Sequence, residues 1–360
     1  MNSNLKALRE MGQSLWLDNI TRQILDDGTL ARWIGEWGLT GLTSNPSIFD
    51  EAIGGSDAYD AGIGAHHRAG LRGEALFIEL ALEDLRRAAR LFEPAHAASG
   101  GVDGWVSMEV SPLVADDTTA SIAAARRIHD QADCRNLFVK IPGTAAGVPA
   151  IEESIYNGVP INVTLLFSTR QYLAVAEAYL RGIERRIAAG RSPVVPSVAS
   201  VFVSRWDKAI AASAPPELHN GLGIAVAMQC YRAYRELLAS PRWKALEAKG
   251  VLPQRLLWAS TSTKDPSAPD TLYVEALAAP DTIDTVPVKT LQAFADHGDA
   301  GAPMAIDGGD AELRLRRYAE AGIDLDALAQ KLQDDGASAF VKSWQQLLRR
   351  IDDKVAALKP

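Results

Sequence analysis

The stretch NLFVKIPGT, residues 136–144, is a strand-like run that carries one charge near its end. Four of its first six residues are apolar, which predicts a buried β-strand that ends at Pro142-Gly143. Lysine is rarely buried without a partner, so Lys140 needs an explanation. It is a surface charge on an edge strand, half of a structural ion pair, or a reactive amine.

Similar runs recur along the chain with helical patterns between them. Alternation of strands and helices implies a parallel sheet, and eight such units in 360 residues favour a (β/α)₈ barrel over an open sheet. The sequence has no G-x-G-x-x-G dinucleotide fingerprint and no phosphate-binding P-loop motif. The eight predicted strands are 14–20, 38–45, 104–112, 136–143, 160–168, 197–205, 255–263 and 281–288.

Two segments between predicted strands, 46–103 and 206–254, are long enough to hold more than one helix each. We interpret them as insertions in one barrel domain spanning 1–360, because neither has its own set of strands. Residues 324–357 are predicted to form a C-terminal helical extension that packs across the barrel.

Composition narrows the classes of protein to consider. A formal net charge of −8 argues against a broad basic surface for nucleic acid, and no apolar segment approaches the length of a membrane span. The two cysteines, Cys134 and Cys230, indicate no disulfide framework and no metal-ligand cluster. We therefore expect a soluble, cytoplasmic protein without a metal and without nucleic-acid or membrane partners. The sequence leaves open whether it is a monomer or a homodimer.

Polar residues gather on one face of several predicted strands, near the end of each. The helix-facing side of a barrel strand is aliphatic, so this polar face points inward, at the C-terminal mouth where barrels place catalytic groups. A structural network with Lys140 paired to Glu109 or Asp18 is the alternative, but one pattern in five strands favours a functional site. The set comprises Asn45, Glu109, Lys140, Asn162 and Thr164, with Asp18 on a less certain face.

These residue types suit one kind of chemistry. A lysine among apolar neighbours can have its pKa lowered, and the neutral amine then attacks a carbonyl to form a Schiff base. Nearby carboxylates, here Asp18 and Glu109, can move the protons that carbon–carbon cleavage requires. Asparagine and threonine can hold the oxygens of a substrate. The set predicts a class I (Schiff-base) aldol enzyme.

Cationic and hydroxyl side chains follow the sixth and seventh predicted strands. Loops after the late strands of barrels often bind phosphate, so we interpret Arg205 and the run after strand seven as a phosphate site. The alternative is a surface ion pair or a helix start with Thr263 or Asp265 as its cap. The run consists of Ser260, Thr261, Ser262, Thr263 and Lys264.

Six motifs together make the sequence resemble the transaldolases, in the same order and through most of the chain. They are LWLDNI, GLTSNPSIF, VSMEVSP, FVKIPGT, INVTLLFS and SVFVSRWD. The tryptophan-rich start and WASTSTKDP are most similar to the longer transaldolases of actinobacteria and cyanobacteria. The resemblance implies a (β/α)₈ barrel that needs no cofactor and acts on sugar phosphates. The implied reaction moves a dihydroxyacetone unit from sedoheptulose 7-phosphate or fructose 6-phosphate to glyceraldehyde 3-phosphate or erythrose 4-phosphate, in the non-oxidative pentose phosphate pathway.

The resemblance also implies a role for each matched residue. Lys140 matches the Schiff-base lysine, and Asp18 matches the aspartate that deprotonates the C4 hydroxyl. Glu109 and Thr164 match a pair that holds a catalytic water. The matched substrate-binding residues are Asn45, Asn162 and Ser200 for hydroxyls, and Arg205 for phosphate. We also expect Phe202, Ser260, Ser262 and Lys264 to contact the substrate.

One motif departs from the family pattern. Many transaldolases carry a second phosphate-binding arginine in an ASFR-like stretch, where this chain has ASTSTK. Ser262 occupies that position, and Lys264 two residues later is the candidate substitute. A lysine ammonium is a point charge and lacks the bidentate fork of arginine.

Two alternative functions remain open. Fructose-6-phosphate aldolase-like lyases, which release free dihydroxyacetone, have a tyrosine where Phe202 stands and a glutamine where Glu109 stands, so the residues present favour the transferase. A barrel that binds sugar phosphate without turnover is disfavoured because pure binding needs no reactive amine beside two carboxylates.

Overall fold

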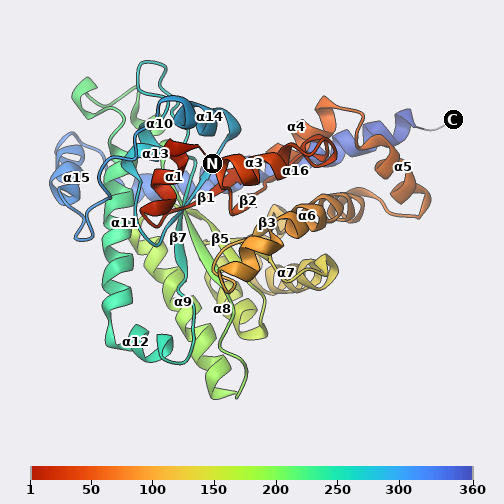
Figure 1. The fold of residues 1–360 in the computed structure, drawn as a ribbon, viewed down its shortest axis with the longest axis horizontal. Helices are drawn as coiled ribbons and strands as arrows, with labels where there is room; N and C mark the ends of the chain where they lie inside the picture. Colours follow the sequence, from red (N-terminus) through yellow and green to blue (C-terminus); the bar gives the residue numbers. More distant parts are fainter. Residues whose placement is uncertain (1, 359–360) are drawn as a thin grey trace.

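The computed structural model describes residues 2–358, in which eight parallel strands form one sheet with the order β2-β1-β8-β7-β6-β5-β4-β3. A parallel bridge between Gly41 and Trp105 joins the two ends of this order, so the sheet closes into a barrel (Figure 1). The predicted (β/α)₈ fold is confirmed. The strands are β1 (Ser14–Asp18), β2 (Gly41–Thr43), β3 (Val106–Glu109), β4 (Leu137–Pro142), β5 (Ile161–Leu166), β6 (Ser197–Phe202), β7 (Arg255–Ala259) and β8 (Ile283–Val286).

Helices surround the barrel, and the two predicted insertions each contain several of them (Figure 1). The first half of the chain has α1 (Ser3–Glu10), α2 (Arg22–Asp26), α3 (Thr29–Trp37), α4 (Pro46–Gly55), α5 (Asp60–Arg68), α6 (Gly73–Ala98), η1 (Pro112–Val114), α7 (Thr118–Ala132), α8 (Gly147–Asn157) and α9 (Thr169–Ala188). The second half has α10 (Ser204–Ile210), η2 (Pro216–Leu218), α11 (Leu222–Ala239), α12 (Pro241–Glu247), α13 (Leu272–Ala276), α14 (Val288–His297), α15 (Ala311–Glu320) and α16 (Leu325–Ala357). No helix within residues 2–358 is both long and apolar enough to cross a membrane.

Strand β4 shows how the sequence builds the two faces of the barrel. Leu137, Val139 and Ile141 alternate along it and are fully buried on the helix-facing side. Burying an aliphatic side chain of this size stabilises the fold by roughly 1.5–3 kcal/mol. Phe138 and Lys140 occupy the opposite face, which points into the barrel. The same strand therefore supplies both core packing and an interior polar group.

Aromatic rings fill the lower part of the barrel interior. The ring of Phe138 stacks on Trp105 with centroids 4.0 Å apart and on Trp16 with centroids 6.1 Å apart. Stacked pairs of this kind contribute about 0.5–1.5 kcal/mol beyond their buried area. This aromatic layer lies directly beneath the level of Lys140 along β4.

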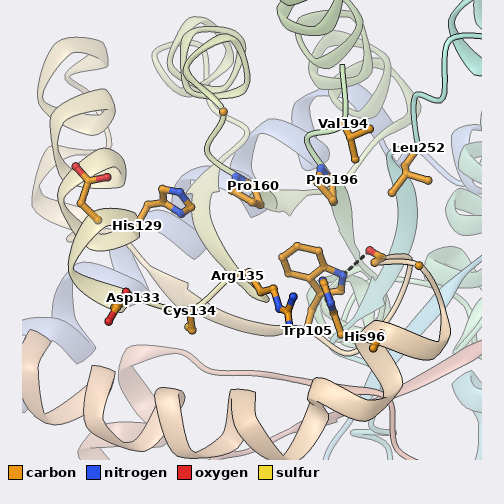
Figure 2. A pocket seen from close by; sticks show the side chains of 15 residues that line it. His96, Trp105, His129, Asp133, Cys134, Arg135, Pro160, Val194, Pro196 and Leu252 are labelled. Atoms are coloured by element: carbon orange, nitrogen blue, oxygen red, sulfur yellow. Dashed lines mark hydrogen bonds between the residues drawn. The ribbon is translucent and has the colours of Figure 1, made fainter. Parts of the chain in front are cut away.

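The N-terminal end of the barrel carries an open cavity of about 770 Å³ (Figure 2). Its lining residues precede the strands, among them Trp105 before β3, Arg135 before β4 and Pro160 before β5. His96 packs edge-on against Trp105, with ring centroids 5.0 Å apart. The Trp105 indole and the rings of Pro160 and Pro196 form part of the cavity wall.

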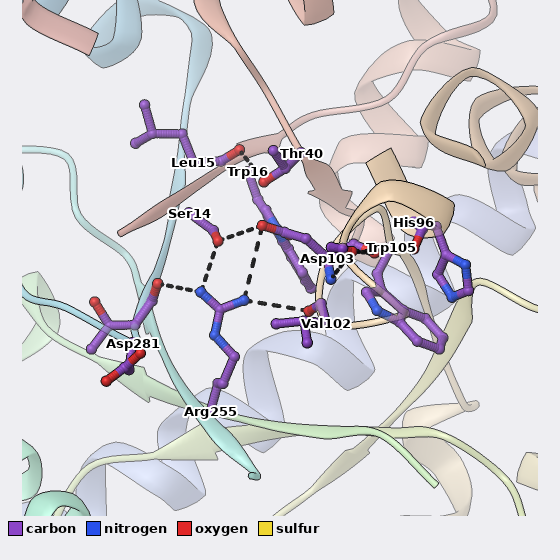
Figure 3. Close-up of polar contacts among 12 residues, drawn as sticks. Ser14, Leu15, Trp16, Thr40, His96, Val102, Asp103, Trp105, Arg255 and Asp281 are labelled. Atoms are coloured by element: carbon purple, nitrogen blue, oxygen red, sulfur yellow. Dashed lines mark hydrogen bonds and ion pairs between the residues drawn. The ribbon is translucent and has the colours of Figure 1, made fainter. Parts of the chain in front are cut away.

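A polar network ties several strand starts together at the same end (Figure 3). The Arg255 guanidinium donates hydrogen bonds to the Ser14 hydroxyl at 2.7 Å and to the Thr282 carbonyl oxygen at 2.8 Å. Asp103 accepts from the Trp16 indole N–H at 2.8 Å and from the Ser14 hydroxyl. Arg255 also lies 3.9 Å from Asp103, so the buried guanidinium has a countercharge. The network therefore joins the N-terminal ends of the strands to one another.

Barrel closure depends on a glycine in the shortest strand. Gly41 bridges to Trp105 and packs against the indole of Trp16. A Cβ at position 41 would lie 2.6 Å from the Trp16 ring and 2.7 Å from the Trp105 carbonyl oxygen. Both distances are shorter than carbon contacts allow, so the approach of β2 to β3 requires glycine.

We expect Gly41→Ala to lower the free energy of unfolding by about 1–3 kcal/mol, because the added methyl group overpacks the junction between β2 and β3. Urea denaturation followed by circular dichroism measures the change. Gly35→Ala is the matched control, because Gly35 lies in α3 with no atom within 4 Å of its would-be Cβ. An unchanged unfolding free energy in Gly41→Ala would contradict the steric role of Gly41.

Candidate functional site

A cavity of about 150 Å³ opens at the C-terminal ends of the strands. Ten of the twelve residues predicted from the sequence as site residues line it, and the other two, Glu109 and Asn162, lie directly behind the lining and bond to it. The ten are Asp18, Asn45, Lys140, Thr164, Ser200, Phe202, Arg205, Ser260, Ser262 and Lys264. The structure thus brings the whole predicted set to one place.

Lys140 lies near the base of this cavity with only 6% of its surface exposed. Its Nζ donates to the Ser44 backbone carbonyl oxygen at 3.0 Å and lies 3.4 Å from Glu109 Oε2. Charge-assisted N–H···O bonds are usually about 2.7–2.9 Å, so the contact with Glu109 is loose. The amine is therefore satisfied by two acceptors without being held in a tight ion pair.

The register of the sheet places Glu109 directly beside Lys140 on the neighbouring strand. Burial raises the pKa of Glu109, and the positive charge of Lys140 opposes that shift. Glu109 Oε1 and the Thr164 hydroxyl are buried and have no hydrogen-bond partner within the described chain. Both atoms are available to a water molecule or to a substrate hydroxyl.

Asp18 is the last residue of β1 and points into the cavity, which settles the face that the sequence left uncertain. The Thr43 hydroxyl, one strand away, donates to Asp18 Oδ1 at 3.0 Å and lies 2.6 Å from the Thr285 hydroxyl. Burial raises the pKa of Asp18, whereas Lys140 and the Thr43 hydrogen bond favour its ionised form. Two carboxyl groups, from the strands β1 and β3 that flank β2, therefore lie at this cavity: Asp18 lines it and Glu109 lies directly behind its lining.

A chain of side-chain hydrogen bonds crosses the barrel beneath the cavity. The Ser200 hydroxyl donates to Asn162 Oδ1 at 2.7 Å, and Asn162 Nδ2 donates to the Ser107 hydroxyl at 3.2 Å. Asn162 is fully buried, so these bonds fix the orientation of its amide. On the other side of the cavity, Asn45 caps α4, because its Oδ1 accepts from the Ile48 N–H at 3.1 Å. This cap leaves the Asn45 amide nitrogen free to donate.

The outer part of the cavity is cationic. The guanidinium of Arg205, at the start of α10, lies over the Phe202 ring at 4.9 Å from its centroid. Burial lowers the pKa of Arg205, and the Glu109 carboxylate opposes the shift. The Lys264 ammonium donates to the Ser262 hydroxyl. Within residues 2–358, neither Arg205 nor Lys264 forms an ion pair with a carboxylate.

The C-terminal helix α16 covers the mouth of the barrel. Gln333, buried on this helix, donates from its amide to the carbonyl oxygens of Gly143 at 3.0 Å and Leu165 at 2.9 Å. Gly143 directly follows β4, and Leu165 lies near the end of β5. A Cβ at Gly336 would lie 3.1 Å from Arg205 Nη1, so the helix backbone closely approaches that guanidinium. One turn further on, Phe340 lines the cavity.

Several cavity residues were missed by the sequence analysis. Thr43 and Thr285 carry a signal, since each alternates onto the inner face of its strand, but Phe340 sits at an ordinary apolar position of a helix. The complete set of missed lining residues is Thr43, Leu257, Ala259, Thr285, Pro287 and Phe340.

The backbone of β5 also departs from regular alternation. Leu165 has a left-handed backbone with φ +59°, which breaks the alternation of β5 after Thr164.

The larger N-terminal cavity is not the better candidate, despite its volume. Its lining contains no lysine, and burial lowers the pKa of His96 and of His129, which favours their neutral forms. An amine, a carboxyl group and two further cations line the smaller C-terminal cavity, and a second carboxyl group, that of Glu109, lies directly behind the lining. Perturbed titratable groups that converge in one cleft mark a functional site more reliably than size does.

Comparison with known proteins is consistent with this geometry. The family model described as Transaldolase/Fructose-6-phosphate aldolase matches residues 15–351. The chain is 40% identical to "Transaldolase 2" of Nostoc punctiforme, with 99% of each chain covered. It is 43% identical to "Transaldolase" of Frankia alni, with 98% of this chain and 97% of the relative covered. It is 40% identical to "Transaldolase" of Neisseria gonorrhoeae, with 96% and 98% covered.

We expect Gln333→Ala to lower the free energy of unfolding by about 1–3 kcal/mol, because two buried carbonyl oxygens lose their donor. Hydrogen exchange should also become faster across α16, which loses its anchor at the mouth. Gln345→Ala on the exposed face of the same helix is the control and should change neither quantity. Equal exchange rates in the two variants would contradict the anchoring role of Gln333.

Proposed function

Because the chain belongs to the transaldolase/fructose-6-phosphate aldolase family, we propose that it transfers a dihydroxyacetone unit between sugar phosphates through a Schiff base on Lys140. The donor is a ketose phosphate, sedoheptulose 7-phosphate or fructose 6-phosphate. The acceptor is an aldose phosphate, glyceraldehyde 3-phosphate or erythrose 4-phosphate. The observation that carries the proposal is the buried Lys140 amine, held loosely between a carbonyl oxygen and a carboxylate at the strand ends.

The first step joins the Lys140 nitrogen to the keto carbon of the donor, and the resulting carbinolamine loses water to give the imine. Each stage moves a proton between nitrogen and oxygen. Glu109 lies 3.4 Å from Lys140 Nζ, and its raised pKa makes it a better proton acceptor than an ordinary glutamate. The Thr164 hydroxyl, which has no partner within residues 2–358, is free to orient the water that carries these protons.

The second step breaks a carbon–carbon bond of the donor. Asp18 takes the proton from the C4 hydroxyl, the C3–C4 bond opens, and the bonding electrons move into the protonated imine to form an enamine. The aldose phosphate leaves with a new aldehyde. An acceptor aldehyde then takes its place, the enamine carbon attacks it, and Asp18 returns the proton to the new hydroxyl. Hydrolysis of the imine releases the product and restores the amine.

Fixed amides and hydroxyls bind the three-carbon unit in this proposal. The hydrogen bonds of Asn162 to Ser200 and Ser107 hold that amide in one orientation. Asn45 is oriented by its cap on α4 and directs its amide nitrogen away from the cap. Side chains that are already ordered lose little entropy when a substrate binds, so they position the reacting carbons well.

The phosphate group of each substrate binds at the cationic outer part of the cavity. Arg205 supplies a planar donor fork, and Lys264 supplies a second positive charge two residues beyond Ser262. The hydroxyls of Ser260 and Ser262 lie beside these cations and add donors. We include a cytoplasmic location, where phosphorylated sugars are retained, in the same proposal.

The second candidate function is a lyase that releases free dihydroxyacetone. It is favoured by the family description, which includes fructose-6-phosphate aldolase, but Glu109 and Phe202 differ from the glutamine and tyrosine of those lyases. The two reactions are distinguished by their need for an acceptor. A transferase turns over fructose 6-phosphate only when erythrose 4-phosphate is present, whereas a lyase needs no acceptor.

We expect incubation with fructose 6-phosphate followed by borohydride reduction to attach a three-carbon adduct to Lys140, because the reduced imine is stable. Peptide mass spectrometry locates the adduct. Lys140→Arg should give no adduct and no measurable turnover, since a guanidinium does not form the imine. Lys249→Arg, an exposed lysine far from the strand ends, should behave as the unmodified protein. An adduct on another lysine would contradict the proposal.

The pH dependence of kcat/KM tests Asp18. The carboxylate is the active form, so activity falls as the pH decreases through its pKa, and burial places that pKa above the ordinary aspartate value of 3.8. Thr43→Val removes a hydrogen bond that favours the ionised form, so the acid limb should move to higher pH. Asp18→Asn should reduce kcat by about a hundredfold or more. An acid limb that is unchanged in Thr43→Val would contradict the assignment of that limb to Asp18.

A further inference from the structure

A second cavity, of about 450 Å³, adjoins the candidate site on its cationic side. Lys264 lines both cavities and so forms the boundary between them. The lining of this side cavity also includes Lys208, Ser204 and Ser267. It is larger than the catalytic cavity and lies next to the part that the proposed function assigns to phosphate.

Three cations converge around the boundary between the two cavities. Arg205 and Lys208 are three residues apart on α10, so they lie on the same face of that helix. Lys264 approaches them from the loop after β7. Burial lowers the pKa of Lys264, and the positive charges of Lys208 and Arg205 add to this effect. Three positive charges so close together repel one another, and an anion bound between them relieves that repulsion.

The two carboxylates that line the side cavity are hydrogen-bonded to neutral donors, and neither forms an ion pair with Lys208 or Lys264 within residues 2–358. Asp207 accepts hydrogen bonds from the Leu222 N–H at 2.8 Å and from the Tyr273 hydroxyl at 2.9 Å. Asp265 accepts from Asn220 Nδ2 at 2.7 Å and from the Ser267 N–H at 2.8 Å.

The structural donors thus engage both carboxylates. No ion pair found among the residues that the structure describes includes Lys208 or Lys264. Both side chains are therefore available to an anionic ligand.

We propose that Lys208 reaches from the side cavity as a third cation, beyond Arg205 and Lys264, toward the phosphate monoester of the sugar substrate at the boundary between the two cavities. This inference rests on the proposed function and adds to it a specificity-determining residue outside the resemblance to known transaldolases. Ser262 provides no charge at its position, so the positive charge that holds a phosphate dianion comes from these three side chains. Recognition by lysine depends on charge more than on geometry, which selects phosphorylated over neutral sugars.

The test compares a phosphorylated acceptor with its neutral analogue at saturating fructose 6-phosphate. For Lys208→Gln we expect KM for erythrose 4-phosphate to rise about five- to tenfold with kcat within twofold, because one charge–charge contact is lost. The kcat/KM for unphosphorylated erythrose should change by less than about twofold, since that substrate has no phosphate to bind. Inorganic phosphate should inhibit the variant more weakly than the unmodified protein, by a similar factor.

Two further variants complete the design. Lys208→Arg keeps the charge and should restore KM for erythrose 4-phosphate, whereas Lys249→Gln removes an exposed lysine elsewhere and should have no effect. An unchanged KM in Lys208→Gln, or equal losses with both acceptors, would overturn the inference. If borohydride still traps the adduct on Lys140 in that case, the proposed function stands and only the role of Lys208 is lost. If the unmodified protein gives no adduct, the proposed function itself has failed.

Discussion

Lys140 carries its amine into the interior of the barrel, where a charged group without partners would cost several kcal/mol. Two acceptors offset this cost, the Ser44 carbonyl oxygen at 3.0 Å and Glu109 Oε2 at 3.4 Å. One acceptor follows β2, the other ends β3, and the lysine itself belongs to β4. The amine is therefore satisfied only when these three strands are correctly joined. The bridge at Gly41, which brings β2 against β3, makes the chemistry of the site depend on barrel closure.

The two ends of the barrel handle polar groups in opposite ways. At the N-terminal end, the charges of buried Arg255 and half-buried Asp103 are matched by each other and by neighbouring donors and acceptors. At the C-terminal end, Glu109 Oε1 and the Thr164 hydroxyl are buried without a partner inside residues 2–358. A fully paired network stabilises and stays rigid, whereas unpaired groups at a cleft are available to a ligand. This contrast separates the structural end of the molecule from the reactive one.

Charge in this protein is local. The chain carries a formal net charge of −8, yet the mouth of the barrel gathers Arg205, Lys208 and Lys264 without ion pairs among the described residues. A negative net charge and a local positive cluster are compatible because interactions between exposed charges are screened beyond about 8–10 Å at ordinary salt concentrations. A phosphate group near the mouth experiences these three cations far more than the distant surface carboxylates. The overall composition excludes a broad basic surface, but it says nothing about such a cluster.

The sequence by itself determined the eight strands, the (β/α)₈ barrel and the convergence of the candidate residues at one end, because strand alternation is a local pattern with a period of two. It could not determine the face of Asp18, the φ of +59° that breaks the alternation at Leu165, or the place of Phe340 in the cavity. These depend on how distant segments pack. Helix α16 reaches the mouth through Gln333, which bonds to carbonyl oxygens at least 168 residues earlier in the chain. No local pattern encodes a contact of that separation, so only the tertiary structure decided what covers the site.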